Sequence, residues 1–539
     1  MKRWLIACCW LGVVGFARGE ELEVRLDEVV AAEMRDWGLT GVAVALIDDQ
    51  ELVLSKGYGE ARKDSVFRVG SISKLFNAIA VMQQVEAGRL DLDAPIPDRW
   101  LPWNPFPDRP AVTLRQILCH RSGLQREGRV GGYLDPSEPG LEASIASLRQ
   151  GVLVTEPSEK MRYSNIAPSL AGFLVSRAVK ETYSDYQRRR ILGPLGMKDS
   201  AWLRHDIPAG RLVRSFMRVA DGNDGWTRRE TPVFDLGTIP AGNLFSTVGD
   251  LAKFASAMLR GGDPLVSKET LAVMWQAQLT DSEFGFGLGF SVGQYRDHRT
   301  VSHSGAVYGH STSLMILPDA KLACVVLVNE DIANGRVRRI SRAALDQLLF
   351  ERRAIPRTEE PLVYAGDDVE RFSGKYESES YWAELKAEKG KLVGDLSGQP
   401  TVFTRTGERT FNADNRITHR GRTTFSEDDS GNVIEFTLSG QRYRRVIEGK
   451  RTVPVEWKNL LGSYGHDFIP LIVSEKFGHL YVMTENMVDY RIRPENRNTW
   501  NLPRGMYVDE EVVFFFDATG RVPRINFANM VFDRLEVNP

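Results

Sequence analysis

The chain has 539 residues, of which 42% are hydrophobic and 26% charged, and its 69 Lys and Arg nearly balance its 71 Asp and Glu. This length exceeds what one hydrophobic core normally holds, so it predicts roughly two to four domains of ordinary globular composition. A net charge of −2 provides no basic field for a phosphate backbone, which argues against nucleic acid as a partner.

The first residues have the pattern of a signal peptide. A charged start, Met1–Arg3, precedes an apolar segment, Trp4–Ala17, and a cut after Gly19 leaves small residues at the two usual positions. We therefore expect a signal peptide over 1–19 and an exported protein, periplasmic or extracellular. The apolar segment is short for a bilayer span, and no later stretch approaches about 20 apolar residues, so no transmembrane anchor is expected.

Two β-hairpins are predicted far apart in the chain, one over 41–54 and one over 313–328, because short apolar runs flank polar turns there. Apolar residues at helical spacing follow the second hairpin over 340–349. Strands at both ends, with helical and loop material between them, predict an α+β domain over 20–352 whose sheet collects the two ends of the segment.

A Ser-x-x-Lys motif opens a predicted helix. The apolar spacing predicts a helix that begins at Ser71 and ends before Gly88, so that Ser71 and Lys74 share a face at its positive end. A serine hydroxyl becomes nucleophilic when a neighbouring base takes its proton, and a desolvated lysine can serve. A chance Ser-x-x-Lys is expected in a chain of this length, so an ordinary helix start remains the alternative.

A Tyr-x-Asn motif follows. Tyr163 and Asn165 are two residues apart, so on an extended segment their side chains point the same way. The phenol can relay a proton and the amide can bind a substrate carbonyl. The alternative is a capped turn before the helix predicted from Ala167 onward.

A third motif, His303-Ser-Gly305-Ala306, lies on a strand-like stretch before the second hairpin. Glycine allows a substrate backbone to lie close, and the Ala306 amide can join that of Ser71 as an oxyanion hole. An ordinary histidine is the alternative. Metal binding with His298 or His310 is disfavoured, because no carboxylate falls at a helical ligand spacing.

From 353 the composition changes to a Pro- and Glu-containing linker over 353–366 and then to short apolar runs between Gly, Asn and Asp turns. This region repeats itself. The segment 372–376 reappears at 460–464, an offset of 88, and four further positions reappear at an offset of 89: Phe425, Gly431, Val433 and Phe436. We therefore expect two all-β, barrel-like modules, the first β module (367–448) and the second β module (453–539).

The order and spacing of the three motifs resemble those of the serine β-lactamases and penicillin-binding proteins, in the Tyr-x-Asn form of the class C β-lactamase, D-aminopeptidase and esterase branch. The stretches 118–124, 193–197 and 241–247 support the resemblance, which covers about 25–350. It implies an antiparallel sheet with helices on both sides. It also implies these roles: Ser71 as the acylated nucleophile, Lys74 and Tyr163 as base and relay, Asn165 as a substrate ligand, and His303, Gly305 and Ala306 as the strand edge along which substrate lies.

One departure affects the substrate. The family usually has lysine where this chain has His303, and a histidine with a pKa near 6.5 is mostly neutral at neutral pH. We therefore expect this position to bind a substrate carboxylate less favourably than a lysine would. The His-x-Gly form and the two trailing β modules are similar to D-aminopeptidases.

The sequence thus predicts a serine hydrolase that forms an acyl-enzyme with a small peptide, amide or ester, with D-amino-acid peptides first and no metal or organic cofactor. A carboxylesterase and a weak β-lactamase are alternatives on the same fold, and a non-hydrolytic protein that senses cell-wall fragments is the alternative from another class. Cys119 and Cys324 are expected to be buried free thiols, although a bridge between them stays open. Two stretches, 125–140 and 205–235, are both candidates to line the pocket.

Overall fold

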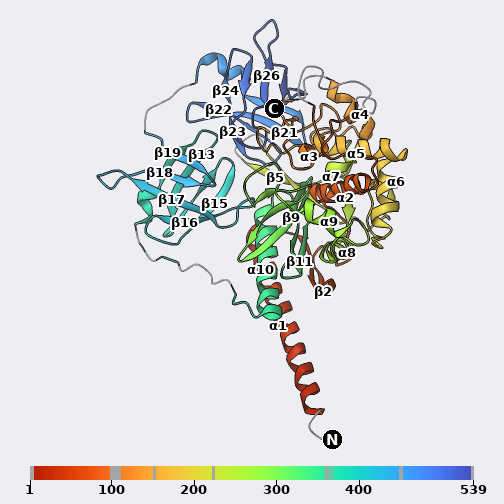
Figure 1. Ribbon diagram of the computed structural model, residues 1–539. Coiled ribbons are helices and arrows are strands. Elements are labelled where there is room, and N and C mark those ends of the chain that lie inside the picture. Colours follow the sequence, from red (N-terminus) through yellow and green to blue (C-terminus); the bar gives the residue numbers. More distant parts are fainter. Residues whose placement is uncertain are drawn as a thin grey trace. The chain divides into compact units, whose positions relative to one another are not determined.

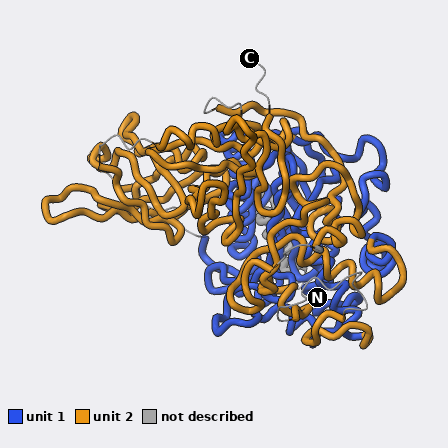
Figure 2. Tube along the Cα trace, turned by 90° about the horizontal axis from the view of Figure 1, so that it is seen from above, with its two compact units in different colours: residues 1–86, 184–215, 244–360 blue, residues 87–183, 216–243, 361–539 orange. Residues whose placement is uncertain are grey.

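The structure is a computed structural model that describes residues 5–97, 111–149, 153–220, 225–357, 363–364, 366, 368–447 and 453–535, with the backbone alone over 5–20. The predicted signal segment 1–19 therefore lies outside the residues whose side chains are described. The chain forms two compact units, coloured separately in Figure 2. Unit 1 comprises 1–86, 184–215 and 244–360, and unit 2 comprises 87–183, 216–243 and 361–539.

Unit 1 is built on a seven-stranded antiparallel sheet with the order β2-β1-β11-β10-β9-β8-β7, of which β2, β9 and β11 are labelled in Figure 1. The first and last of these seven strands in chain order, β1 and β11, are neighbours in the sheet, with Val42 opposite Val328. The predicted hairpins, and their pairing in one sheet that joins the two ends of the 20–352 segment, are thus confirmed. The strands are β1 Gly41–Asp48, β2 Glu51–Gly59, β7 Gly285–Phe286, β8 Ser291–Tyr295, β9 His298–Val307, β10 His310–Leu317 and β11 Leu322–Val328.

Helices cover both faces of this sheet. Alternate residues of β1 and β11, such as Val44 and Val326, form one core with Leu26 of α1 and Leu348 of α10, and these two helices lie side by side in Figure 1. Helix α8 packs on β1 and β11, whose remaining residues are also buried. The predicted α+β fold is confirmed. The other elements of unit 1 begin and end as follows: α1 Leu5–Trp37, β3 Phe67–Arg68, η1 Gly70–Ile72, α2 Ser73–Glu86, α6 Tyr183–Gln187, η4 Arg188–Leu192, η5 Arg204–Asp206, β6 Phe245–Ser246, α8 Val248–Leu259, α9 Lys268–Met274 and α10 Asn334–Arg353.

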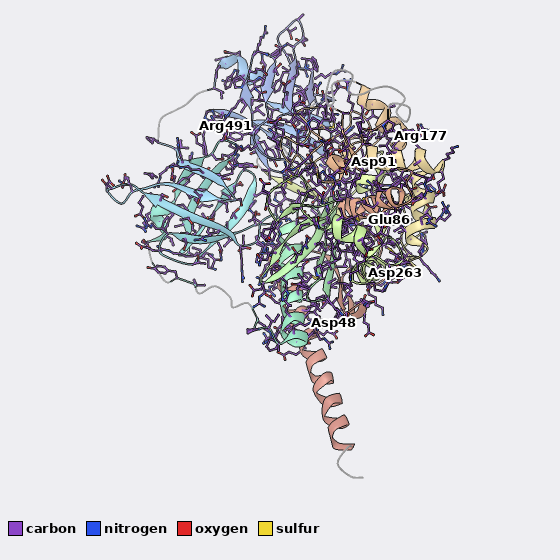
Figure 3. The ribbon with its side chains drawn as sticks, viewed as in Figure 1. Asp48, Glu86, Asp91, Arg177, Asp263 and Arg491 are labelled. Carbon is purple, nitrogen blue, oxygen red and sulfur yellow. The ribbon has the colours of Figure 1, made fainter. Side chains whose placement is uncertain are left out.

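The helices of unit 1 are also tied together by side-chain contacts. Glu86, labelled in Figure 3 at the end of α2, accepts a hydrogen bond from the backbone N–H of Ser267, the N-cap of α9, at 2.8 Å. Among the helices that the structure describes, none is both long enough and apolar enough to cross a membrane.

Unit 2 begins with a helical part. Helix α5 is buried along most of its length and contacts α3, α4 and α7. A capping box starts α3, in which the Thr113 hydroxyl accepts from the Gln116 N–H and the Gln116 side chain accepts from the Thr113 N–H. The elements are α3 Leu114–Leu118, α4 Gly140–Ala146, η3 Ser147–Arg149, α5 Ile166–Val179, β4 Phe216–Ala220, β5 Trp226–Glu230 and α7 Ile239–Gly242.

The rest of unit 2 is all-β, as expected. The first β module is a closed barrel of eight antiparallel strands around an aromatic core that includes Phe372, Phe425 and Phe436. Its elements are η6 Val369–Phe372, β12 Gly374–Glu377, β13 Trp382–Glu388, β14 Lys391–Leu396, β15 Gln399–Arg405, β16 Thr410–Asp414, β17 Gly421–Glu427, β18 Val433–Leu438 and β19 Gln441–Arg445.

The second β module consists of a four-stranded sheet, β20 to β23, and a five-stranded sheet, β24 to β28, which a bridge between Tyr464 and Arg534 connects. It is therefore not a second copy of the closed eight-stranded barrel. Its elements are η7 Val455–Leu460, β20 Gly462–His466, β21 Ile469–Lys476, β22 His479–Met483, β23 Asp489–Arg491, β24 Arg493–Pro494, β25 Thr499–Asn501, β26 Glu511–Phe515, β27 Arg524–Phe527 and β28 Met530–Asp533.

The repeat seen in the sequence is visible in the start of each β module. A short 3₁₀ turn leads into the first strand, and a buried tyrosine hydroxyl donates back to that turn: Tyr376 to the Phe372 carbonyl at 2.8 Å and Tyr464 to the Leu460 carbonyl at 2.9 Å. An arginine lies over the tyrosine ring in each module, Arg445 over Tyr376 and Arg534 over Tyr464, and these two arginines are also 89 residues apart. The two β modules thus begin with the same 3₁₀ turn and tyrosine hydrogen bond, although their sheets differ.

The two β modules also contact each other. The indole N–H of Trp382 donates to Asp489 at 2.8 Å, and the backbone N–H of Arg491, labelled in Figure 3, donates to the Ser380 carbonyl at 2.9 Å. These bonds join the barrel to β23 within unit 2.

Candidate active site

Ser71 lies in η1, the single turn between β3 and α2. Gly70 has a positive φ of 54°, and an added Cβ would lie 3.0 Å from the Ala306 nitrogen, so this position requires glycine. The Ser73 hydroxyl donates to the Gly70 carbonyl at 2.6 Å and accepts from the Leu244 N–H at 3.0 Å. The α-helix therefore begins at Ser73, two residues later than expected, because a fixed 3₁₀ turn presents Ser71.

Lys74 lies one turn further on. Its Nζ donates a hydrogen bond to the Ser71 hydroxyl oxygen across 3.0 Å, and its side chain is buried whereas Ser71 is half-buried. A serine that retains some exposure, next to a desolvated lysine, is the arrangement that an activated nucleophile needs. Since the positive end of α2 lies beneath it, the turn also favours negative charge at the serine.

Strand β9 passes beside this turn. Strand β8 pairs with β9 only as far as Ser302, so residues 303–307 have no β8 partner on that side of the sheet within the described chain. The other side pairs normally with β10, with Gly305 opposite Thr312. The stretch from His303 to Ala306 is therefore a strand edge next to η1.

Gly305 is required by the protein's own packing. An added Cβ would lie 2.1 Å from the Val69 carbonyl oxygen and 2.2 Å from the Thr312 hydroxyl, which itself donates to Val69 at 2.9 Å. Gly305 thus allows β9 to lie against the segment that carries Ser71, and its expected role in the approach of substrate stays a prediction.

His303 is buried, and its Nδ1 lies 2.7 Å from the Ser304 carbonyl oxygen. Burial, and then the charge of Lys74, lower the pKa of the imidazole to about 4. The ring is therefore neutral at neutral pH, and this strand edge carries no cation at the position where the family usually has lysine.

Tyr163 and Asn165 belong to unit 2, in the segment that precedes α5. Both are half-buried while the intervening Ser164 is buried, so their side chains point to the same side, as expected from their spacing. The Tyr163 ring stacks on His120, with ring centroids 4.2 Å apart, and the Ser164 N–H donates to His120 Nδ1 at 3.3 Å. The Asn165 amide donates to the carboxylate of Glu127.

Three side chains near Tyr163 and Asn165 were not predicted from the sequence as site residues: Arg126, Glu127 and Arg162. Glu127 is fully buried and accepts from both Asn165 and the Tyr133 N–H, the latter at 3.0 Å. Of the two stretches proposed to line the pocket, 125–140 therefore lies at the Tyr-x-Asn segment. Its only sequence signal was an acidic residue in a Gly-rich stretch, which is too common to single out.

The histidines considered for metal binding lie apart from such a site. His298 Nδ1 is 3.1 Å from a single carboxylate, that of Asp319. His310 is buried, and burial followed by the nearby Arg68 charge lowers its pKa to about 3. Among the described residues, no three His, Cys, Asp or Glu side chains are grouped as metal ligands would be.

The structure thus brings Ser71, Lys74 and the edge from His303 to Ala306 together in unit 1, and it holds Tyr163 and Asn165 side by side in unit 2. Cys119 and Cys324 are buried free thiols, in line with the prediction.

Comparison with known proteins agrees with this geometry. The family described as Beta-lactamase matches residues 26–349. "Beta-lactamase-like protein 2" of Dictyostelium discoideum is 24% identical over 62% of this chain and 65% of that protein, so this chain spans less than two thirds of that relative's length. "Esterase EstB" of Burkholderia gladioli is 27% identical over 54% of this chain and 86% of that protein.

Among solved structures, the D-amino acid amidase from Ochrobactrum anthropi SV3, complexed with L-phenylalanine amide, is 26% identical, with a TM-score of 0.50 over 62% of this chain and 99% of that one. The family match covers more than half of the chain and contains all three motifs. This chain belongs to the β-lactamase family.

Proposed function

We propose that this chain is a serine hydrolase that acts through an acyl-enzyme on small amides, peptides or esters, with amides and peptides of D-amino acids as the preferred substrates. The observation that carries the proposal is the buried Lys74 amine 3.0 Å from the Ser71 hydroxyl at the start of α2. The similarity to a D-amino acid amidase over 62% of this chain supports the substrate class.

Acylation begins when Ser71 Oγ attacks the substrate carbonyl carbon and its proton passes to Lys74, either directly or by way of Tyr163. The carbonyl oxygen becomes an oxyanion, which the backbone N–H groups of Ser71 and Ala306 receive. The carbon–nitrogen or carbon–oxygen bond then breaks, the leaving amine or alkoxide takes a proton from Tyr163, and the Tyr163 phenolate recovers a proton from Lys74, so that both groups return to their starting states. Deacylation repeats these steps with water in place of Ser71.

The neutral His303 disfavours substrates that present a carboxylate to β9. An imidazole with a pKa of about 4 attracts a free carboxylate at neutral pH far less than a lysine at this place. We therefore expect amides and esters without a free C-terminal carboxylate to be preferred over penicillins and over peptides with a free C-terminus.

A carboxylesterase is the second candidate, because an alkoxide leaving group depends less on protonation than an amine and the same Ser71–Lys74 pair suffices. The 27% identity to an esterase over 86% of that protein's length supports it. Relative kcat/KM values for a D-alanine p-nitroanilide and for short-chain p-nitrophenyl esters distinguish the two activities.

The test is intact-mass analysis of the protein after exposure to a fluorophosphonate, the D-alanine p-nitroanilide and a penicillin. We expect an adduct on Ser71 with the fluorophosphonate and turnover of the anilide or of the esters. The Ser71→Ala variant should form no adduct, whereas Ser282→Ala, which alters an exposed serine elsewhere in unit 1, should react like the parent. Lys74→Met should slow acylation by about 10²–10⁴-fold.

Failure of the folded parent protein to form any adduct would refute the hydrolase and favour a non-hydrolytic binding protein. Turnover of the penicillin ahead of the anilide and the esters would refute the substrate preference while leaving the acyl-enzyme in place.

We also infer export, because the charged and then apolar start over 1–19 has the pattern of a signal peptide. N-terminal sequencing of protein recovered outside the cytoplasm should begin at Glu20, and an intact Met1 there would contradict the inference.

A further inference from the structure

A buried group of charged side chains joins the Tyr-x-Asn segment to the second β module within unit 2. The guanidinium of Arg162 donates to the carboxylate of Glu510, and each side chain is only 2% exposed. The same carboxylate oxygen accepts the backbone N–H of Arg126 at 3.0 Å. One carboxylate of the second β module thus holds both chain segments that surround Tyr163.

Arg126 is fixed relative to that tyrosine through the backbone as well. Its carbonyl oxygen accepts from the N–H groups of Asn165 and Ile166, at 2.7 and 3.3 Å. Its guanidinium lies 5.7 Å from the centre of the Tyr163 ring and 5.2 Å from that of Tyr507. The distance between this cation and the Tyr163 phenol therefore does not depend on a flexible side chain alone.

The carboxylates around Arg126 hold its charge in place. Its Nη2 lies 3.7 Å from Glu485 and its Nε lies 3.8 Å from Glu127. Burial by itself lowers the pKa of the guanidinium, but Tyr507, Glu485, Glu127 and Tyr163 together raise it above its ordinary value. Electrostatic coupling between two groups is reciprocal. Because the ionised Tyr163 phenol stabilises the Arg126 cation, the Arg126 cation equally stabilises the ionised Tyr163 phenol.

This arrangement matters because His303, being neutral, provides no cation to unit 1 at the family's usual position. Within the part of unit 2 that the structure describes, His120 and Arg126 lie against the Tyr163 ring, and Glu127, Glu485, Tyr507 and Glu510 lie next to Arg126. Arg162, the neighbour of Tyr163 in the chain, is paired with Glu510, whereas the Arg126 guanidinium lies 5.7 Å from the centre of the Tyr163 ring.

We propose that Arg126, clamped by the second β module, is the positioning residue of Tyr163 and favours its phenolate form during proton transfer. The proposal rests on the function proposed above. It gives the second β module a role in the ionisation of Tyr163, since Glu485, Tyr507 and Glu510 all belong to that module.

Two variants separate charge from packing. Arg126→Lys keeps the cation, and Arg126→Gln removes it. Because the lone substitution by glutamine leaves buried carboxylates without their cation, a double variant with Glu485→Gln is included to restore the charge balance. Arg129→Gln, which alters an exposed arginine three residues away, is the matched control.

The first readout is the pH dependence of kcat/KM on the best substrate. In both glutamine variants we expect the ascending limb to move to higher pH by about one unit or more, and kcat to fall by about 10-fold or more with KM little changed. Arg126→Lys and Arg129→Gln should keep the limb of the parent. A limb that stays in place in both glutamine variants while activity follows the folded fraction would overturn the proposal.

The second readout needs no turnover. Ionisation of Tyr163 is followed by the ultraviolet absorbance of the phenolate, as the difference between each protein and its Tyr163→Phe counterpart. We expect the Tyr163 phenol to ionise at higher pH by about one unit or more once Arg126 is glutamine. An unchanged titration would overturn the proposal. If Ser71 cannot be acylated, the hydrolase fails, but this titration still reports on Arg126.

Discussion

A neutral, buried His303 predicts a specific loss of stability in acid. Its pKa of about 4 in the folded state lies below the ordinary value of 6.5, so between these values the unfolded state binds more protons than the folded state. Stability therefore falls as the pH decreases through this window and levels off below about 4. The full difference corresponds to about 3 kcal/mol of unfolding free energy, of which about 2.5 kcal/mol is lost by about pH 4.5.

The perturbation is His303→Gln, which keeps a neutral polar side chain at every pH. Between about pH 7 and pH 4.5 the parent should lose about 2.5 kcal/mol more than this variant. His205→Gln, at an exposed site with 72% of the side chain accessible, should behave like the parent. Urea-dependent hydrogen exchange, read on peptides from β9 and β10, measures the free energy where His303 lies, because two units need not unfold together.

An equal pH-dependent loss in the parent and in His303→Gln would refute the reasoning, since it would show that His303 is not held neutral by its surroundings. A loss that appears only in peptides from unit 2 would refute it as well, because His303 belongs to unit 1.

Three further predictions concern glycine packing, the barrel and the thiols. Gly305→Ala should lower the unfolding free energy by about 1–3 kcal/mol, because the new Cβ would lie 2.1 Å from a backbone oxygen. The Cβ of the control variant Gly293→Ala meets only a threonine hydroxyl at 3.2 Å, so this variant should lose less unfolding free energy. Equal losses of unfolding free energy in chemical denaturation would contradict the prediction. Tyr376→Phe should destabilise the first β module by about 1–2 kcal/mol by removing its 2.8 Å bond to a backbone carbonyl, and unchanged exchange protection in the barrel would count against this role. Iodoacetamide should not label Cys119 or Cys324 in the folded protein, since burial raises their pKa values to about 11 and 12, and labelling without urea would disprove it.

Much of the fold was predictable because it follows local patterns. The hairpins over 41–54 and 313–328 appear as apolar runs around polar turns, and their pairing in one sheet followed from their places at the two ends of the segment. The Ser71–Lys74 contact was predictable for the same reason, since three residues of helical spacing bring two side chains together.

The charged group around Tyr163 could not be predicted, because it depends on contacts between distant parts of the chain. Arg126 and Glu510 are 384 residues apart, and a single arginine or glutamate has no periodicity that reveals its partner. The packing role of Gly305 could not be predicted for the same reason, since the carbonyl that excludes a Cβ there belongs to Val69, on a segment far away in sequence. A sequence repeat does not show whether a sheet closes into a barrel. The 88-residue offset therefore did not reveal that only the first β module is a closed barrel among the described residues.

The ion pair between Arg162 and Glu510 also imposes an order on folding. The two partners are separated by 348 residues, so a chain emerging from the ribosome exposes Arg162 long before its carboxylate has been made. Until then the segment that carries Tyr163 lacks its clamp, and burial of an uncompensated guanidinium is costly. The nucleophile turn belongs to unit 1, whose residues are complete by 360, so unit 1 can mature first and the tyrosine side last. The ion pair that holds the tyrosine segment can therefore form only after Glu510 has been synthesised.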